Sequence, residues 1–285
     1  METVAVHSRA PDANAQQPNA RSRTNLVLAA LSPEARAHLV SHLRIQTLPE
    51  RYLLWECGSR PERIWFPVSA LVSVLAPTPA GTALEVGSVG FDGALGFDGH
   101  GPSFTRATVR SAGIVASLPV QVFATAAAER EELRRLEAVC REWLTVQAQQ
   151  ASLCHATHTA EARFARYLMR AAEFAETGVV TATQETAAEM LGLRRTTVTL
   201  IAGNLQAAGI IRYRRGVITI CDPAALRATA CPCTEVLGRD RWPSEILLRA
   251  GSRAAGSSDD GAREQVGAVR SVPPASDAGR ATPGE

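Results

Sequence analysis

Residues 183–220 read TQETAAEMLGLRRTTVTLIAGNLQAAGIIRYRRGVITI, and this stretch predicts two helices joined by a tight turn. Thr183 carries a hydroxyl that can cap a helix over residues 184–191. Gly192 follows, and glycine readily adopts the left-handed conformation that ends a helix. A second helix is predicted by apolar residues at three-to-four spacing, namely Val198, Ile201, Leu205 and Ala208. Two helices joined by so short a turn form a helix-turn-helix.

The segment behind the second helix predicts a β-hairpin. Gly209 ends the helix, and residues 210–213 and 217–220 are rich in β-branched side chains. Arg214, Arg215 and Gly216 lie between them as a tight turn, with positive φ expected at the glycine. The hairpin would form a wing beside the second helix.

Positive charge is concentrated in this region. The whole chain carries a formal charge of only +2, and its 30 basic residues are all arginine, so arginine content alone says little. Between residues 194 and 227, however, six arginines face a single acid, Asp222, which leaves a local charge of +5. The six are Arg194, Arg195, Arg212, Arg214, Arg215 and Arg227. Such clustering is typical of a nucleic-acid-binding surface.

The segment GLRRTTVTLIAGNLQAAGIIRYRRGVITICD, residues 192–222, resembles the winged helix-turn-helix of the Crp/Fnr family of bacterial transcription regulators. The resemblance extends over about residues 26–230, where IWFPVSALVSVLAPTPAGTALEVGSVG looks like the central strands of the family's β-roll. It implies a homodimer that binds two-fold symmetric double-stranded DNA, with RNA polymerase as a further partner. It also implies a sensory β-roll like that of cyclic-nucleotide-binding domains.

The resemblance places the DNA contacts at the start of the second helix and in the wing. Arg195 lies where the family carries its principal base-contacting arginine, which suits guanine. Thr196 stands where many members carry Glu, and Leu200 where the best-known members carry Arg, so a different target sequence is expected. Thr196 and Thr199 are candidates for a thymine methyl or a base edge. Phosphate contacts are expected from Arg194, Thr197, Arg214 and Arg215.

Short apolar segments punctuated by Gly and Pro fill the N-terminal half and predict a sandwich or barrel of strands. They cover residues 51–55, 63–66, 71–76, 82–89, 105–110 and 114–118. The predicted fold class is α+β: an N-terminal jelly-roll-like β-roll, a long dimerisation helix and a C-terminal winged helix-turn-helix. The expected parts are a disordered N-terminus (1–25), a β-roll domain (26–130), the dimerisation helix (131–157), the DNA-binding domain (158–230) and a disordered tail (231–285).

Residues 121–157 read as one long helix with two apolar stripes. The first stripe follows three-to-four spacing and suits a coiled-coil seam: Leu136, Val139, Trp143, Val146, Gln150, Leu153 and Thr157. The second, Leu133, Cys140, Leu144 and Gln147, is expected to pack on the β-roll. An ordinary core helix is the alternative to a dimerisation helix.

Effector binding is the least specified feature. Glycines recur at every third position from Gly87 to Gly96, and the candidate effector residues are Gly90, Asp92, Thr105 and Arg106. Cyclic-nucleotide binders of the family carry a Gly-Glu pair and an Arg followed by Ser or Thr. Here Thr105 precedes Arg106 and no Glu follows these glycines, so canonical cyclic-nucleotide binding is not expected. The alternatives are another ligand or a purely structural β-roll.

No metal site is predicted. Cys231 and Cys233 are candidates for metal binding or redox sensing, but Cys-X-Cys lacks the usual paired spacing of zinc sites, so reduced surface thiols are expected. An iron–sulfur cluster is not expected, because the first cysteine is Cys57 and the N-terminal cluster of the iron–sulfur members is missing. His155 and His158 could both serve as ligands, with exposed or capping roles as the alternative.

The remaining patterns limit the class of protein. Neither a membrane-spanning run nor the apolar core of a signal peptide is present, which predicts a cytoplasmic protein. A cupin-type metalloenzyme would need several inward histidines, and the β segment holds only His100, so no enzyme is predicted. The other alternative is a ligand-binding β-roll module that has lost DNA binding.

Overall fold

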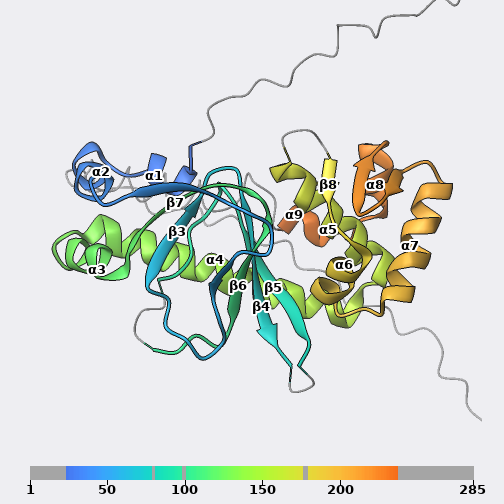
Figure 1. Cartoon of the computed structure of the whole chain (residues 1–285), viewed down its shortest axis with the longest axis horizontal. Helices are drawn as coiled ribbons and strands as arrows, with labels where there is room; N and C mark the ends of the chain where they lie inside the picture. The colour runs from blue at the N-terminus through green and yellow to red at the C-terminus, as the bar shows by residue number, and fades with distance from the viewer. Residues whose placement is uncertain (1–23, 79–80, 98–100, 176–178, 237–285) are drawn as a thin grey trace, which may run out of the picture.

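The computed structural model describes residues 24–78, 81–97, 101–175 and 179–236 of the chain. Two N-terminal sheets, a long central helix and a C-terminal helical domain follow one another in these stretches (Figure 1). This is the predicted α+β fold class. Within the described residues, every helix is too short or too polar to cross a membrane. His100 lies outside the described residues.

Two antiparallel sheets form the β-roll, with strand orders β1-β7-β3 and β2-β6-β4-β5. The strands are β1 (Arg44–Leu48), β2 (Leu53–Trp55), β3 (Arg63–Pro67), β4 (Leu71–Pro77), β5 (Ala83–Val89), β6 (Arg106–Ser111) and β7 (Gly113–Pro119). Residues from both sheets, such as Val72, Val109 and Val115, pack in one core. All strands but β1 overlap segments predicted from alternation. In β1 only Leu48 is buried, while Ile45 is 74% exposed, so the strand carries no clear apolar alternation.

Three helices cover one side of the sheet that contains β3 and β7: α1 (Leu26–Ala29), α2 (Pro33–Val40) and α3 (Val120–Glu129). Asn25 fixes the start of this layer. Its amide nitrogen donates to the carbonyl oxygens of Pro67 and Gly93, each at 2.8 Å, and its side-chain oxygen caps α1. Asn25, predicted to belong to a disordered N-terminus, is therefore a buried structural residue; residues 1–23 lie outside the described part.

The helix predicted over residues 121–157 is interrupted at Arg130, whose backbone is extended. α3 ends at Glu129, and a separate helix, α4 (Glu131–Thr157), follows. Glu131 and Glu132 stabilise the start of α4, because they place negative charge at the positive N-terminal end of the helix. The carboxylate of Glu132 also accepts hydrogen bonds from the amide and hydroxyl of Ser32, both at 2.7 Å, which ties α4 to the start of α2.

The apolar stripe of α4 is mostly an internal packing face. Four residues predicted for a coiled-coil seam are buried within the chain, namely Leu136, Val139, Trp143 and Gln150. Only the C-terminal part of the stripe is open, because Leu153 is 51% exposed and Thr157 is also exposed. For the four buried positions the core-helix alternative holds, and a seam to a second copy cannot use them in this conformation.

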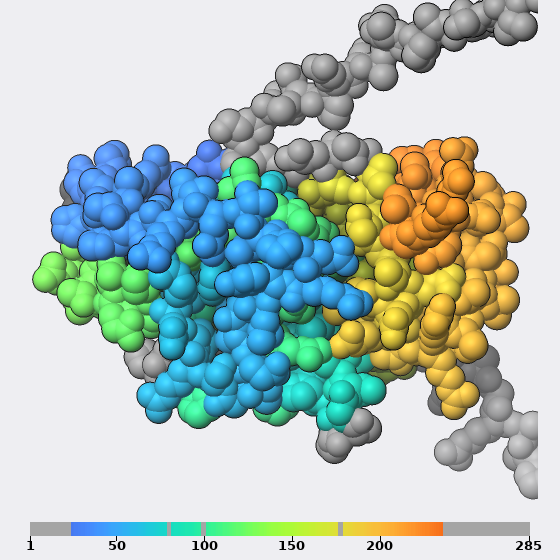
Figure 2. Space-filling model, in the orientation of Figure 1, coloured from blue at the N-terminus to red at the C-terminus, as the bar shows by residue number. Residues whose placement is uncertain are grey.

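The C-terminal domain combines helices with a three-stranded sheet of order β8-β10-β9. Its elements are α5 (Ala160–Phe174), β8 (Val179–Thr181), α6 (Gln184–Leu191), α7 (Arg195–Ala207), β9 (Ile211–Arg214), β10 (Val217–Ile220), α8 (Pro223–Thr229) and α9 (Cys233–Val236). Leu75 of β4 and Ala83 of β5 join the core of this domain. The domain therefore packs directly against the β-roll, as the continuous surface in Figure 2 shows.

Candidate nucleic-acid interface

The helix-turn-helix forms as the sequence predicts. The hydroxyl of Thr183 caps α6 by accepting a hydrogen bond from the amide of Thr186 at 3.0 Å. Gly192 adopts φ 62°, and the amide of Leu193 donates to the carbonyl oxygen of Ala188 at 2.9 Å. These bonds close the end of α6 and turn the chain directly into α7.

α7 presents two different faces. Val198, Ile201 and Leu205 are buried against the rest of the domain. Arg195 and Leu200 are exposed, Leu200 to 66%, on a helix at the end of the molecule away from the β-roll (Figure 1). The polar face of α7 is therefore free to meet a large partner.

The N-terminal end of α7 suits an anion. Arg194 occupies the N-cap position, and its side chain makes no capping hydrogen bond. An arginine side chain has no acceptor, and the amide of Thr197 donates to the carbonyl oxygen of Arg194 at 3.0 Å. Within the part of the chain that the structure describes, no group caps the amides of Arg195 and Thr196, which are left for a group from outside the chain. The positive end of the helix dipole and the guanidinium groups of Arg194 and Arg195 add to the attraction, and a phosphate group matches this environment.

The wing is a two-residue hairpin. Arg214 of β9 pairs with Val217 of β10, so Arg215 and Gly216 form the turn. Both have positive φ, 50° and 80°, which is typical of a type I′ turn. The sequence predicted positive φ only at the glycine. The amide of Tyr213 donates to the side-chain oxygen of Gln206 at 2.8 Å, which fastens the wing to α7.

All predicted DNA-contacting residues lie in this region, six of them exposed and Thr197 half-buried: Arg194, Arg195, Thr196, Thr197, Thr199, Arg214 and Arg215. Among the described residues, none forms an ion pair or hydrogen bond with the side chains of the four arginines. The hydroxyl of Thr199 already donates within the protein, at 2.7 Å from the side-chain oxygen of Gln184 and 2.9 Å from the carbonyl oxygen of Arg195. This leaves its methyl group as the part better suited to a thymine contact.

The predicted effector residues do not meet at one site. Asp92 accepts a hydrogen bond from the amide of Gly90 at 3.1 Å and pairs with Arg170 of α5 at 2.7 Å. Arg106 instead pairs with Glu189 of α6 at 2.8 Å, and Thr105 lines a different cavity. Gly90 leaves no room for a ligand, since a Cβ there would lie 1.9 Å from the ring of Phe174.

Two buried arginines that no sequence pattern indicated have structural roles, and one of them joins the two domains. Arg110, at 4% exposure, pairs with Glu85 at 3.3 Å, donates to the carbonyl oxygen of Tyr167 at 3.1 Å and lies 3.6 Å from the centre of that ring. Arg163 donates to the carbonyl oxygen of Leu191 at 3.1 Å, which fixes the C-terminal end of α6. Neither arginine belongs to a recognisable motif, so only the fold could reveal these roles.

The cysteine predictions require correction. Cys231 and Cys233 are not surface thiols but are buried, at 2% and 5% exposure. Helix α9 covers Cys233–Val236, so a tail starting at residue 231 is also wrong at its boundary. Burial is the main cause that raises the pKa of Cys233 to about 12, and the neighbouring thiol of Cys154 raises it further. His158 ends α4 and approaches Cys233, whereas His155 bonds to the carbonyl oxygen of Ala151.

Taken together, these elements define a winged helix-turn-helix domain with an exposed arginine-rich face, attached to a β-roll through a long helix. Residues 162–229 match the family of Crp-like helix-turn-helix domains. A comparison with curated protein sequences gives no match.

Several solved structures share the fold over about two thirds of this chain. FixK2 from Bradyrhizobium japonicum aligns with a TM-score of 0.58 and 15% identity, over 66% of this chain and 98% of FixK2. CLP from Xanthomonas campestris, described as a c-di-GMP-responsive global regulator, gives 0.55 and 16%, over 66% and 99%. A Crp/Fnr-family transcriptional regulator from Thermus thermophilus gives 0.54 and 23%, over 66% and 98%.

The chain thus has the fold of the Crp/Fnr regulators, and its residues 162–229 match the Crp-like helix-turn-helix domains. The resemblance predicted from residues 192–222 is confirmed. These similarities support a DNA-binding transcription regulator.

Proposed function

We propose that this protein is a transcription regulator that binds double-stranded DNA as a homodimer, with α7 in the major groove. The observation that carries the proposal is the exposed N-terminal end of α7. There Arg194 and Arg195 accompany uncapped amides, and the arginine wing is fastened to the same helix. A recognition helix enters the groove with its N-terminal residues toward the bases, which is where these groups lie.

The residues divide into two roles. Arg195 reads a base, because a guanidinium can bond to both acceptors of guanine. Thr196 and the methyl of Thr199 add base-edge contacts. Arg194, Thr197, Arg214 and Arg215 hold phosphates, which position the helix without specifying sequence.

The test is selection of bound sequences from a random DNA pool by the full chain, followed by titration of the selected site. Arg195→Ala is expected to cost about 1–3 kcal/mol on the selected site and to relax its specificity. Arg215→Ala is expected to weaken binding to all sequences alike and to reduce the salt slope by about one. Arg60→Ala, an exposed arginine of the β-roll, is the matched control and is expected to bind as the wild type does.

Selection that returns no two-fold motif under any condition would contradict the regulator. Equal losses for Arg195→Ala on selected and random DNA would contradict the base-reading role alone.

Regulation by an effector is proposed for a cavity of about 300 Å³ between the β-roll and α4. Its lining includes Trp55, Phe97, Thr105, Arg141 and Leu144. Of the four predicted effector residues only Thr105 lines this cavity. A ligand there would contact α4 directly and so would act on the helix that leads to the DNA-binding domain. Repeating the DNA selection with cell-extract metabolites tests whether an effector changes binding.

RNA polymerase is the further partner that the proposed regulator implies.

A further inference from the structure

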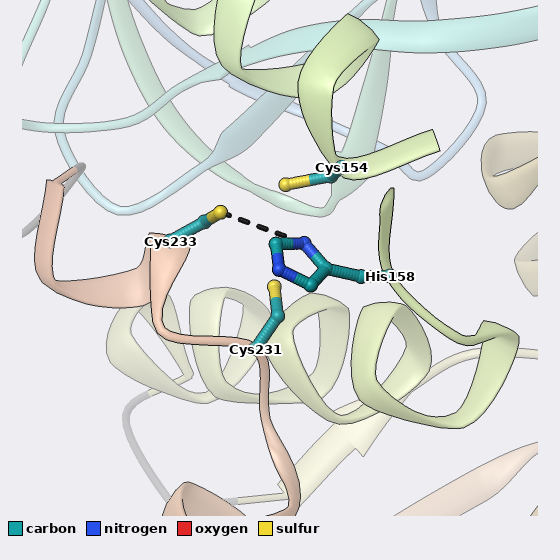
Figure 3. Close-up of side chains that lie close together, drawn as sticks. All are labelled: Cys154, His158, Cys231 and Cys233. Carbon is teal, nitrogen blue, oxygen red and sulfur yellow. Dashed lines mark hydrogen bonds between the residues drawn. The ribbon is translucent and has the colours of Figure 1, made fainter. Parts of the chain in front are cut away.

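Four side chains of metal-binding type meet where the long helix ends. Cys154 and His158 lie one helical turn apart at the C-terminal end of α4, and Cys231 and Cys233 follow α8 (Figure 3). Their ligand atoms all lie within 4.8 Å of one another. The three cysteines are almost fully buried, and His158 is half-buried.

We propose that these four residues bind one zinc ion. Three thiolates and one imidazole form the Cys₃His set of structural zinc sites. Bond lengths of about 2.3 Å to sulfur and 2.0 Å to nitrogen place neighbouring ligand atoms of a tetrahedral site about 3.5–3.8 Å apart. The Sγ atom of Cys233 already lies 3.7 Å from Nδ1 of His158. With four protein ligands the site has no open position, so its role is structural.

A buried amide supports the sulfur ligands from outside. The side-chain nitrogen of Gln150 approaches Sγ of Cys233 at 2.8 Å and Sγ of Cys154 at 3.8 Å. Donors of this kind orient metal-bound ligands and are a regular part of such sites. Gln150 is itself buried, at 9% exposure, within the helix that carries Cys154.

A mononuclear ion explains the group better than redox chemistry does. A disulfide would use two of the three sulfurs and give the converging His158 no role. An iron–sulfur cluster distributes its ligands over more than one metal, whereas these four ligand atoms all lie within 4.8 Å of one another, close enough to share one ion.

The ion would control the joint between the long helix and the DNA-binding domain. His158 ends α4 and Thr159 caps α5, so the joint is very short. Cys231 also donates its amide to the carbonyl oxygen of Ala162 in α5, at 3.3 Å. A zinc ion would therefore fix the angle between α4 and α5 and, with it, the direction of α7. This consequence rests on the proposed DNA-binding function, but the metal site itself does not.

The test starts with the metal content of the full chain, purified under reducing conditions. One zinc per chain is expected for the wild type and for Cys221→Ser, a control at an exposed cysteine. Cys233→Ser and His158→Ala are expected to lose the metal. After chelation, refilling with Co²⁺ is expected to give the visible bands of tetrahedral cobalt with a thiolate charge-transfer band, and Cys233→Ser is expected to lack them.

Three results would overturn the site: no zinc in the wild type together with no thiolate–cobalt bands, iron with the absorption of a cluster, or a disulfide among the three cysteines in the reduced preparation. DNA binding is measured separately on the selected sequence. Removal of zinc is expected to weaken it about tenfold, within the usual range of coupling between sites, and zinc is expected to restore it. A protein that binds zinc but not DNA would contradict the proposed regulator without contradicting the metal site.

Discussion

At the scale of single residues, Arg194 shows a conflict between stability and binding. Most helices begin with a side-chain oxygen that accepts an amide hydrogen, and α7 begins with an arginine that cannot. The arrangement leaves the start of the helix less stable and keeps the amides of Arg195 and Thr196 available for a phosphate.

Arg194→Asn is expected to stabilise the folded protein by about 1 kcal/mol, because asparagine is a good N-cap. The same variant is expected to bind DNA more weakly, since it loses a charge and occupies an amide that would meet the phosphate. Urea unfolding and DNA titration measure the two effects. Arg194→Ala is the control, which removes the charge without adding an acceptor. If Arg194→Asn were no more stable than Arg194→Ala, the uncapped start of α7 would not be a source of instability.

At this scale the sequence could predict only features that depend on residues close together in the chain. Thr183 and Gly192 act on neighbours a few residues away, so the helix-turn-helix was predictable and is confirmed. The proposed zinc ligands Cys154 and Cys233 are far apart in sequence, and Cys154 stands in no recognisable motif. Their meeting depends on α5 and α8 packing together, which no local pattern encodes.

At the scale of elements, the apolar stripe of α4 bears on two separate questions: whether the segment is a helix, and what packs against that helix. The stripe predicts a helix correctly, but it does not say which neighbour covers the helix. In the structure the chain itself covers most of the helix, and its exposed residues are polar or alanine except for Leu153. Seven of the exposed positions follow three-to-four spacing along one face: Arg135, Ala138, Glu142, Thr145, Gln149, Ser152 and Ala156.

A homodimer formed along this open face would place Leu153 at or near the contact. Leu153→Glu is expected to weaken self-association by about tenfold or more, equal to about 1.4 kcal/mol, because a charge would be withdrawn from water. Sedimentation equilibrium measures the change. Val40→Glu in α2, also an exposed apolar position, is the matched control and is expected to leave association unchanged. A dimer insensitive to Leu153→Glu would have to use another surface.

At the scale of the whole molecule, Arg110 connects the sheets to the DNA-binding domain. Its guanidinium, on β6, meets Glu85 of β5 and the backbone of α5 at Tyr167. Ser73 of β4 donates a hydrogen bond to the same carboxylate of Glu85. Three strands and one helix therefore share a single buried ion pair.

Arg110→Met is expected to destabilise the protein by about 3 kcal/mol, because it leaves Glu85 without its charge partner in a largely buried place. Thermal or urea unfolding measures the loss. The double variant Arg110→Met with Glu85→Gln is expected to recover part of it, since no uncompensated charge remains. Equal destabilisation in the single and double variants would show that packing, and not charge, holds this junction.

The shared core of the β-roll and the C-terminal domain limits how freely the two halves can be exchanged. Leu75 and Ala83 belong to the sheet by sequence and to the DNA-binding domain by packing, and Leu84 lies directly over the turn at Gly192. A chimera that joins this DNA-binding domain to another sensor would leave uncovered the apolar surface that Leu75 and Ala83 pack against, unless the β4–β5 hairpin were included. The part of this protein that could be moved to another sensor is therefore the DNA-binding domain together with the β4–β5 hairpin.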